Sequence, residues 1–190
     1  MTDRRFTVAL IVGSVSEPSL NRRLANALVG LSPDAGLSLV DVEIGHLPFF
    51  RAQYQSEDEY PEVGRRLKSS VDSADGLLIV TPEYNRSIPG VLKNAIDWLS
   101  RPEDASSFPG LPSAVTGMSE GAVSTAVAQT HLKSILTSQG AHVLGEPEAY
   151  VQYEAGMIAD DGTVADGSTR DFLLEFLRSF QDLIRRHAAS

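Results

Sequence analysis

Short apolar runs alternate with longer amphipathic segments along this chain. The run 6–12 is nearly continuous, is rich in β-branched residues and ends at Gly13, which is typical of a strand buried on both faces. Apolar residues of the intervening segments recur at helical spacing. The pattern predicts strands at 6–12, 37–44, 76–81, 113–116 and, broken by Pro147, within 141–151, and helices from Ser19 to about Gly30, at 58–73, 88–99 and 122–138, and from Ser168 to at least Ile184.

This strict alternation of strand and helix predicts an α/β fold. Its spacing indicates a parallel sheet with helices on both faces, joined by right-handed crossovers. Internal repeats, low-complexity tracts and Gly/Ser linkers are absent from the sequence, so we expect one domain over residues 1–190. We also expect Ser168 to cap the last helix, with Asp171 three residues on.

Composition removes several classes of function. The 190 residues include 16 Lys plus Arg, 25 Asp plus Glu and no Cys, giving a net charge of -9. Without cysteine there is no disulfide, thiolate metal site or cysteine nucleophile, so redox chemistry would need a cofactor. The acidic excess without a basic tract argues against nucleic acid and anionic membranes as partners. The apolar runs are too short to span a bilayer, and residues 1–6 lack a signal peptide, so a cytoplasmic protein is expected.

The first strand leads into a loop rich in hydrogen-bond donors. Ser14, Ser16 and Ser19 offer hydroxyls and Asn21 an amide, beside the free N–H groups and positive dipole end of the following helix. This arrangement suits a phosphate monoester. The loop lacks the Gly-Lys-Ser/Thr of a nucleotide P-loop and the three-glycine dinucleotide fingerprint. The alternative is that Ser19 only caps the helix and that the other serines occupy a solvated loop.

The loop 81–90, directly after the second central strand, carries the more specific signal. Pro82 stiffens the backbone, Tyr84 offers a flat face, and Asn85 with its neighbouring peptides presents donors and acceptors. Glu83 disfavours a phosphate here but permits a neutral heteroaromatic ring. The alternative is a rigid β-to-α turn with an incidental tyrosine.

Two further segments bear on the site. After the fourth strand, Gly117 and Gly121 allow the backbone to approach a ligand, although glycines in such turns are routine. The helix at 91–99 has an apolar stripe wide enough for two faces, with Trp98 as a possible anchor for a partner subunit; the alternative is a helix of the intramolecular core. Asp97 on this helix fits a surface ion pair better than a catalytic role.

Other catalytic classes find little support. The four histidines have no metal-ligand spacing, so no metal site is expected, and the acidic turn at 160–162 does not match an EF-hand loop. A serine hydrolase is disfavoured because no Gly-x-Ser-x-Gly elbow follows a strand. The four histidines are His46, His131, His142 and His187.

Taken together, Gly13-Ser14, Ser19 and Asn21 with the contiguous stretch 82–98 resemble the NAD(P)H-dependent FMN reductase family, and the resemblance spans roughly residues 6–151. It implies a flavodoxin-like three-layer sandwich with a five-stranded parallel sheet of order 2-1-3-4-5. It also implies FMN as cofactor, NADPH or NADH as reductant, a homodimer or homotetramer, and flavins, quinones, azo dyes or metal oxyanions as small-molecule acceptors.

The resemblance assigns roles residue by residue. It implies phosphate contacts for Ser14, Ser19 and Asn21, with the Gly117 loop at the far edge of the flavin. The family often has arginine where this chain has Ser16, a loss for which Arg22 or Arg23 can compensate, and glycine where it has Arg86. Along the isoalloxazine ring it places Pro82, Glu83, Tyr84 and Asn85, with Ser87 close by.

The chemistry implied needs no catalytic side chain, because flavin N5 accepts the hydride and the protein binds and orients. Ping-pong kinetics follow if nicotinamide and acceptor occupy the same place in turn. Three alternatives stay open: a different physiological acceptor on the same fold, a flavodoxin-like electron carrier that does not turn over NAD(P)H, and a protein that has kept the fold but lost the cofactor.

Overall fold

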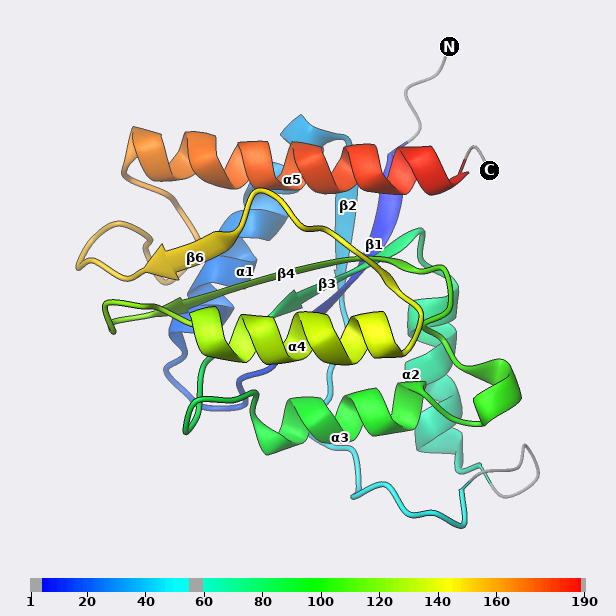
Figure 1. Cartoon of the computed structure of the whole chain (residues 1–190). Coiled ribbons are helices and arrows are strands. Elements are labelled where there is room, and N and C mark those ends of the chain that lie inside the picture. The colour runs from blue at the N-terminus through cyan, green and yellow to red at the C-terminus, as the bar shows by residue number, and fades with distance from the viewer. Residues whose placement is uncertain (1–4, 55–59, 189–190) are drawn as a thin grey trace.

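The computed structural model describes residues 5–54 and 60–188. Figure 1 shows the helices and strands of these parts of the chain. In chain order they are β1 (Phe6–Val12), α1 (Leu20–Leu31), β2 (Leu37–Asp41), α2 (Glu62–Asp72), β3 (Gly76–Val80), α3 (Gly90–Leu99), β4 (Pro112–Ser119), α4 (Ala126–Ser138), β5 (His142–Val143), β6 (Ala149–Gln152) and α5 (Gly167–Ala188), with short 3-10 turns at Ser32–Ala35 and Glu103–Ala105.

All strand pairs of the sheet are parallel, in the order β2-β1-β3-β4-β5, as the resemblance implied. The fifth position is shared by two short strands. Pro112 and Ser113 at the start of β4 pair with β5, whereas β6 pairs with the end of β4 from Thr116 onward. Pro147 lies between β5 and β6, as predicted, because proline cannot donate to the ladder.

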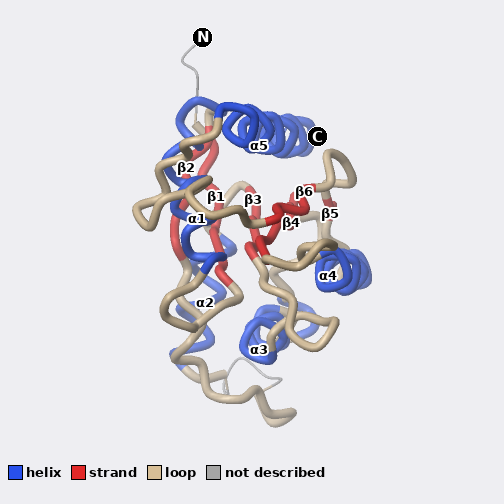
Figure 2. Tube along the Cα trace, turned by 90° about the vertical axis from the view of Figure 1, so that its left-hand side faces the viewer, coloured by secondary structure: helices blue, strands red, loops and turns tan. Residues whose placement is uncertain are grey.

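Side chains of the strands alternate between two hydrophobic cores. Val8, Leu10 and Val12 of β1 point into the core covered by α1 and α5. Ala9 and Ile11 point into the core covered by α2, α3 and α4. Figure 2 shows strands between α5 on one side and the α3–α4 pair on the other. The prediction of strands buried on both faces is therefore confirmed.

Several predicted boundaries are wrong. β4 extends from Pro112 to Ser119 rather than over 113–116, because it pairs on both edges, which sequence alone does not show. α2 begins at Glu62 after Pro61; the predicted start at 58 lies outside the described residues. α4 begins at Ala126, four residues later than predicted, after a turn, and β2 ends at Asp41.

Trp98 is a core residue, so its predicted role as an anchor for a partner is wrong. Its side chain is fully buried, its indole Nε1–H donates to Pro48 O at 2.8 Å, and its ring stacks on Tyr54. The second apolar face of α3 is covered by the segment after β2 and by α2. Asp97 pairs with Lys93 at 2.6 Å, the surface ion pair expected.

The N-terminal cap was predicted correctly for α1 but not for α5. Ser19 caps α1, its Oγ accepting from Arg22 N at 3.2 Å, as expected. α5 is capped by Asp166 rather than Ser168: the carboxylate accepts from Thr169 N, and the Ser168 hydroxyl donates to it as well. No helix within the described parts of the chain is long and apolar enough to cross a membrane.

Candidate functional site

The candidate site lies where β1, β3 and β4 end, on the left of Figure 1. At this edge the chain connections from β1 and β3 turn to opposite sides, and ligands of open α/β sheets bind at such a point. A cavity of about 390 Å³ opens here, within the usual size of ligand pockets. The predicted residues that line it are Ser14, Ser16, Ser19, Asn21, Pro82, Glu83, Tyr84 and, from the third loop, Gly121.

One end of the cavity is the start of α1. The first backbone bond of the helix runs from Arg23 N to Ser19 O at 3.2 Å, so the N–H groups of Leu20 and Asn21 lie ahead of it. The Ser14 hydroxyl lies beside them and accepts weakly from Ser16 N at 3.4 Å. Hydroxyls, leading N–H groups and the helix dipole together favour an anion.

Asn21 is buried, and its side chain joins α1 to β4. Its Nδ2 donates to Met118 O at 3.0 Å and its Oδ1 accepts from Met118 N at 2.9 Å. The amide thereby satisfies both backbone groups of a residue that lines the cavity. Sequence reasoning missed this bridge because 97 positions separate the two residues.

The other end of the cavity is a two-residue hairpin. Tyr84 and Ser87 exchange backbone hydrogen bonds of 2.9 and 3.0 Å, and the central residues Asn85 and Arg86 have φ of 51° and 64°. Positive φ at both positions is the geometry of a type I′ turn. Asn tolerates this geometry and Gly adopts it freely, whereas an arginine such as Arg86 adopts it only with strain.

Glu83 fastens this hairpin to α4. One carboxylate oxygen accepts from Val127 N at 3.0 Å and Ala128 N at 3.1 Å, and the other from Arg86 Nη1 at 3.3 Å. α4 has no capping bond from the side chain of Thr125, so Glu83 replaces a local cap. The charge is thus compensated next to the cavity, and sequence gave no signal for this contact.

A single side-chain contact joins the two ends of the cavity. Ser16 Oγ and Tyr84 Oη are 3.4 Å apart, and Tyr84 remains 46% exposed. The Tyr84 ring therefore lies at the mouth, next to Ser16.

Three predicted residues do not line the cavity. Asn85 forms the tip of the hairpin, and Ser87 Oγ contacts His131 Nδ1 at 3.2 Å on α4. Gly117 lies inside β4, where a Cβ would come within 2.0 Å of Thr81 O. Its glycine is required for the close approach of β3 and β4. The expectation that the loop from Gly117 to Gly121 lines the site fits Met118, Ser119 and Glu120, which line the cavity; Pro18 and Leu20 of the first loop line it as well, although the prediction gave them no individual role.

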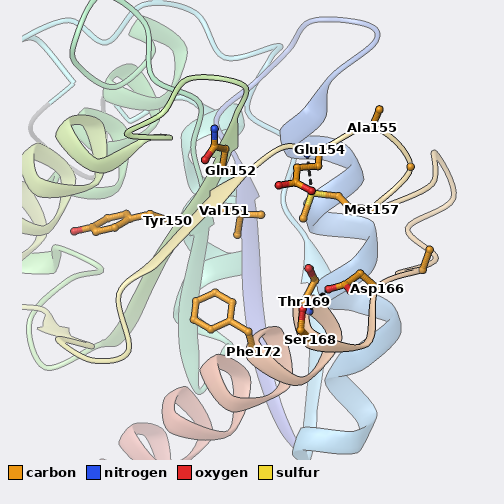
Figure 3. Close-up of a pocket in the computed structure, with 12 residues that line it drawn as sticks. Tyr150, Val151, Gln152, Glu154, Ala155, Met157, Asp166, Ser168, Thr169 and Phe172 are labelled. Atoms are coloured by element: carbon orange, nitrogen blue, oxygen red, sulfur yellow. Dashed lines mark hydrogen bonds between the residues drawn. The ribbon is translucent and has the colours of Figure 1, made fainter.

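A larger cavity of about 720 Å³ lies between β6, the segment 154–166 and the start of α5 (Figure 3). Several of its polar groups are already paired. The hydroxyl of Ser168 and the N–H of Thr169 bond to Asp166 and hold the pKa of that carboxyl below its usual range. Burial and a hydrogen bond to Glu148 raise the pKa of Tyr150 to about 12. This cavity is therefore the weaker candidate for a polar ligand.

Metal-ligating groups do not gather near either cavity. Among residues 5–54 and 60–188, no three His, Asp or Glu side chains form a group that could hold a metal ion. The rings of His142 and His187 are 4.1 Å apart, a pairing that their sequence positions did not suggest.

Comparison with known proteins gives consistent matches. The family model described as NADPH-dependent FMN reductase matches residues 6–156. A 2-hydroxy-1,4-benzoquinone reductase from a Burkholderia species is 42% identical, with 94% of this chain and 96% of that protein covered. A quinone reductase from Pseudomonas putida is 39% identical, with 97% of each covered. The structure of the flavoenzyme NAD(P)H:(acceptor) oxidoreductase FerB from Paracoccus denitrificans superposes with a TM-score of 0.89 at 41% identity, covering 96% of this chain and 98% of that one.

The residues of the cavity fit FMN. The start of α1 supplies hydroxyls and N–H groups suited to a single phosphate, while residues 82–84 and 118–121 supply peptide groups and the Tyr84 ring at the other end. Because the charge of Glu83 is compensated by two backbone N–H groups and Arg86, it does not oppose a ring that takes up electrons. The chain belongs to the NADPH-dependent FMN reductase family, has the flavodoxin-like fold, and is an oxidoreductase that uses FMN and NAD(P)H.

Proposed function

We propose that this protein reduces quinones with NAD(P)H, using FMN bound in the cavity between α1 and the Tyr84 hairpin. The observation that carries the proposal is the make-up of that cavity, which joins an anion-binding helix start to a flat, peptide-lined wall at one edge of the sheet. Similar proteins named quinone reductase and 2-hydroxy-1,4-benzoquinone reductase favour a quinone among the possible acceptors.

In this proposal the phosphate lies at the start of α1. The hydroxyls of Ser14, Ser16 and Ser19 donate to it, together with the N–H groups of Leu20 and Asn21. The side-chain amide of Asn21 contributes indirectly, because its two bonds to Met118 fix the position of the helix start against β4.

The flavin ring lies along the hairpin. Pro82, Glu83 and Tyr84 line the cavity, and Asn85 keeps the turn in shape through its positive φ. Ser87 lies behind the hairpin against His131. Gly117 contributes indirectly, because its lack of a side chain allows the close approach of β3 and β4 next to the site.

Bound FMN supplies hydride acceptance at N5 and electron transfer to the acceptor. The side chains bind and orient, and no described residue is required as a general acid or base. The half-exposed Tyr84 leaves the mouth open to solvent. NAD(P)H and quinone can therefore use the same opening in turn, which gives ping-pong kinetics.

We also propose that the protein is a homodimer or homotetramer in the cytoplasm. Val15, Tyr84 and Val123 are 61%, 46% and 53% exposed and come from the loops that follow β1, β3 and β4. Apolar side chains exposed around one edge favour a covering partner, and a second copy is the simplest one. Light scattering after size-exclusion chromatography measures the assembly.

An anaerobic absorbance titration tests the function. Protein reconstituted with FMN and desalted should retain about one flavin per chain, bleach on addition of NADPH and recover on addition of a benzoquinone. A flavin that binds but does not bleach would contradict NAD(P)H turnover. A flavin that bleaches but is not reoxidised faster by quinone than by buffer would contradict the proposed acceptor. Riboflavin, which lacks the phosphate, should bind more weakly than FMN.

A further inference from the structure

Two arginines on the first turns of α1 point at the outside of the serine loop. Arg22 Nη1 lies 2.6 Å from Asp41 Oδ2, and Arg23 Nε lies 2.6 Å from Asp160 Oδ1. Side chains on a helix lean toward its N-terminus, which brings both guanidinium groups beside the loop rather than along the helix. Arg23 is also oriented by Tyr153, whose hydroxyl lies 3.3 Å from Arg23 Nη1.

Both arginines open onto cavities that adjoin the proposed phosphate position. A cavity of about 560 Å³ is lined by Arg22, Arg23, Asp160 and residues 16–19. A second of about 350 Å³ lies between residues 14–17 and residues 42–46, and Arg22 lines it as well. Arg22 therefore stands between two cavities that share the serine loop with the candidate site.

The ion pairs of both arginines are easily exchanged. The Arg22 and Asp41 side chains are 40% and 44% exposed, and those of Arg23 and Asp160 are 24% and 86% exposed. Ion pairs open to solvent on at least one side contribute little net stability. A phosphate dianion offers more charge and more acceptor oxygens than an aspartate and binds arginine bidentately. Glu17, which lines the same cavity, opposes an anion but is a single flexible carboxylate at the exposed rim.

We propose that Arg22 and Arg23 form a phosphate-monoester subsite on the outer side of the serine loop, exchanging Asp41 and Asp160 for phosphate oxygens. This inference rests on the proposed function. Because the proposed function already places the single phosphate of FMN in the candidate cavity, the phosphate proposed here is the 2′-phosphate of NADPH, and the ligands below separate the two sources.

Equilibrium titrations of Arg22→Gln, Arg23→Gln and the double variant test the subsite without turnover. Flavin fluorescence reports FMN and riboflavin; calorimetry reports adenosine 2′,5′-bisphosphate and AMP. Loss of one charge-assisted phosphate contact should weaken binding about tenfold or more. A loss for FMN but not riboflavin would overturn the proposal, because the arginines would then serve the flavin phosphate. A loss for the bisphosphate but not AMP assigns the 2′-phosphate and predicts reduced preference for NADPH over NADH.

Arg66→Gln is the control for loss of an arginine, because Arg66 forms an ion pair with Glu62 on α2 and lines neither cavity beside the serine loop. If the double variant binds the bisphosphate within twofold of this control, the subsite is wrong. If the unmodified protein binds no FMN, the proposed function fails instead, and the bisphosphate titration still decides the inference.

A variant that should strengthen phosphate binding distinguishes a binding role of the arginines from a purely structural one. Asp160→Asn removes the competing carboxylate at a position that is almost fully exposed, so it should not unfold the protein. If Arg23 exchanges Asp160 for a phosphate, Asp160→Asn should bind adenosine 2′,5′-bisphosphate a few-fold more tightly. Unchanged or weaker binding would overturn the exchange. Asp182→Asn, from the Arg185 ion pair on α5, is the control.

Discussion

The two loops that form the ends of the candidate cavity are built in opposite ways. The hairpin 82–87 is closed by two backbone hydrogen bonds and tied to α4 by Glu83. The serine loop 13–19 has an internal contact of 3.4 Å from Ser16 N to Ser14 Oγ and one of 3.4 Å from Ser16 to Tyr84. A neutral ring needs a preformed wall, whereas a phosphate can organise donors around its own charge. The rigid loop is therefore the one that faces the neutral ring, because the ring has no charge with which to order the residues around it.

The largest effect should come from the strand beneath the hairpin. In Gly117→Ala the new Cβ meets Thr81 O at 2.0 Å, so β3 and β4 must separate just where the hairpin begins. We expect a loss of about 3 kcal/mol or more, or failure to fold, measured by urea denaturation. Gly30→Ala is the control, because its Cβ meets nothing within 4 Å on a helix. It should gain about 0.5 to 1 kcal/mol. Equal stability of the two variants would refute the close-approach argument.

The contact between Glu83 and the start of α4 is tested by Glu83→Ala. The change removes the acceptor for Val127 N and Ala128 N at the start of α4, and we expect a loss of about 2 kcal/mol by denaturant titration. Glu83→Gln keeps one acceptor oxygen without the charge and should fall between this variant and the original protein. FMN affinity should fall with Glu83→Ala as well, because the hairpin loses its position. A stability change below about 0.5 kcal/mol would show that Glu83 does not cap α4 in solution.

Arg86→Gly should strengthen the hairpin. Arg86 has φ of 64°, which glycine adopts without strain, and its contact with Glu83 is 72% exposed on the arginine side. We expect a gain of about 1 kcal/mol in the free energy of unfolding, measured by thermal and urea denaturation. Asn85→Gly provides the comparison, with a smaller gain because asparagine tolerates positive φ. A loss of stability for Arg86→Gly would mean that its ion pair outweighs the backbone strain.

The serine loop should be the least sensitive part of the site. Ser16→Ala removes the contact with Tyr84 on an exposed loop, and we expect the free energy of unfolding to stay within about 0.5 kcal/mol. Tyr84→Phe removes the same contact from the other side and should match it. FMN affinity is the second measurement, and it should fall more for Ser16→Ala if the hydroxyl meets the phosphate. A stability loss as large as that of Glu83→Ala would erase the difference between the two loops.

Much of this architecture could be predicted from local sequence. The β-branched runs at β1 and β3, the cap at Ser19 and the break at Pro147 each act over a few residues, and the structure has all of them. Predictions failed where long-range packing decides the outcome. Trp98 is apolar enough for an interface, but the segment after β2 covers it.

The sequence by itself determined the alternation of strands and helices, and it determined that hydroxyls follow the first strand and a stiff Tyr84 loop follows the third. These features depend on local periodicity and turn chemistry. Only the tertiary structure decided that Glu83 caps α4, that Asn21 bonds Met118, and that Arg22 and Arg23 face carboxylates beside the serine loop. Those contacts join residues up to 137 positions apart (Arg23 and Asp160). Their existence depends on how the sheet brings the ends of distant strands together, which no local pattern encodes.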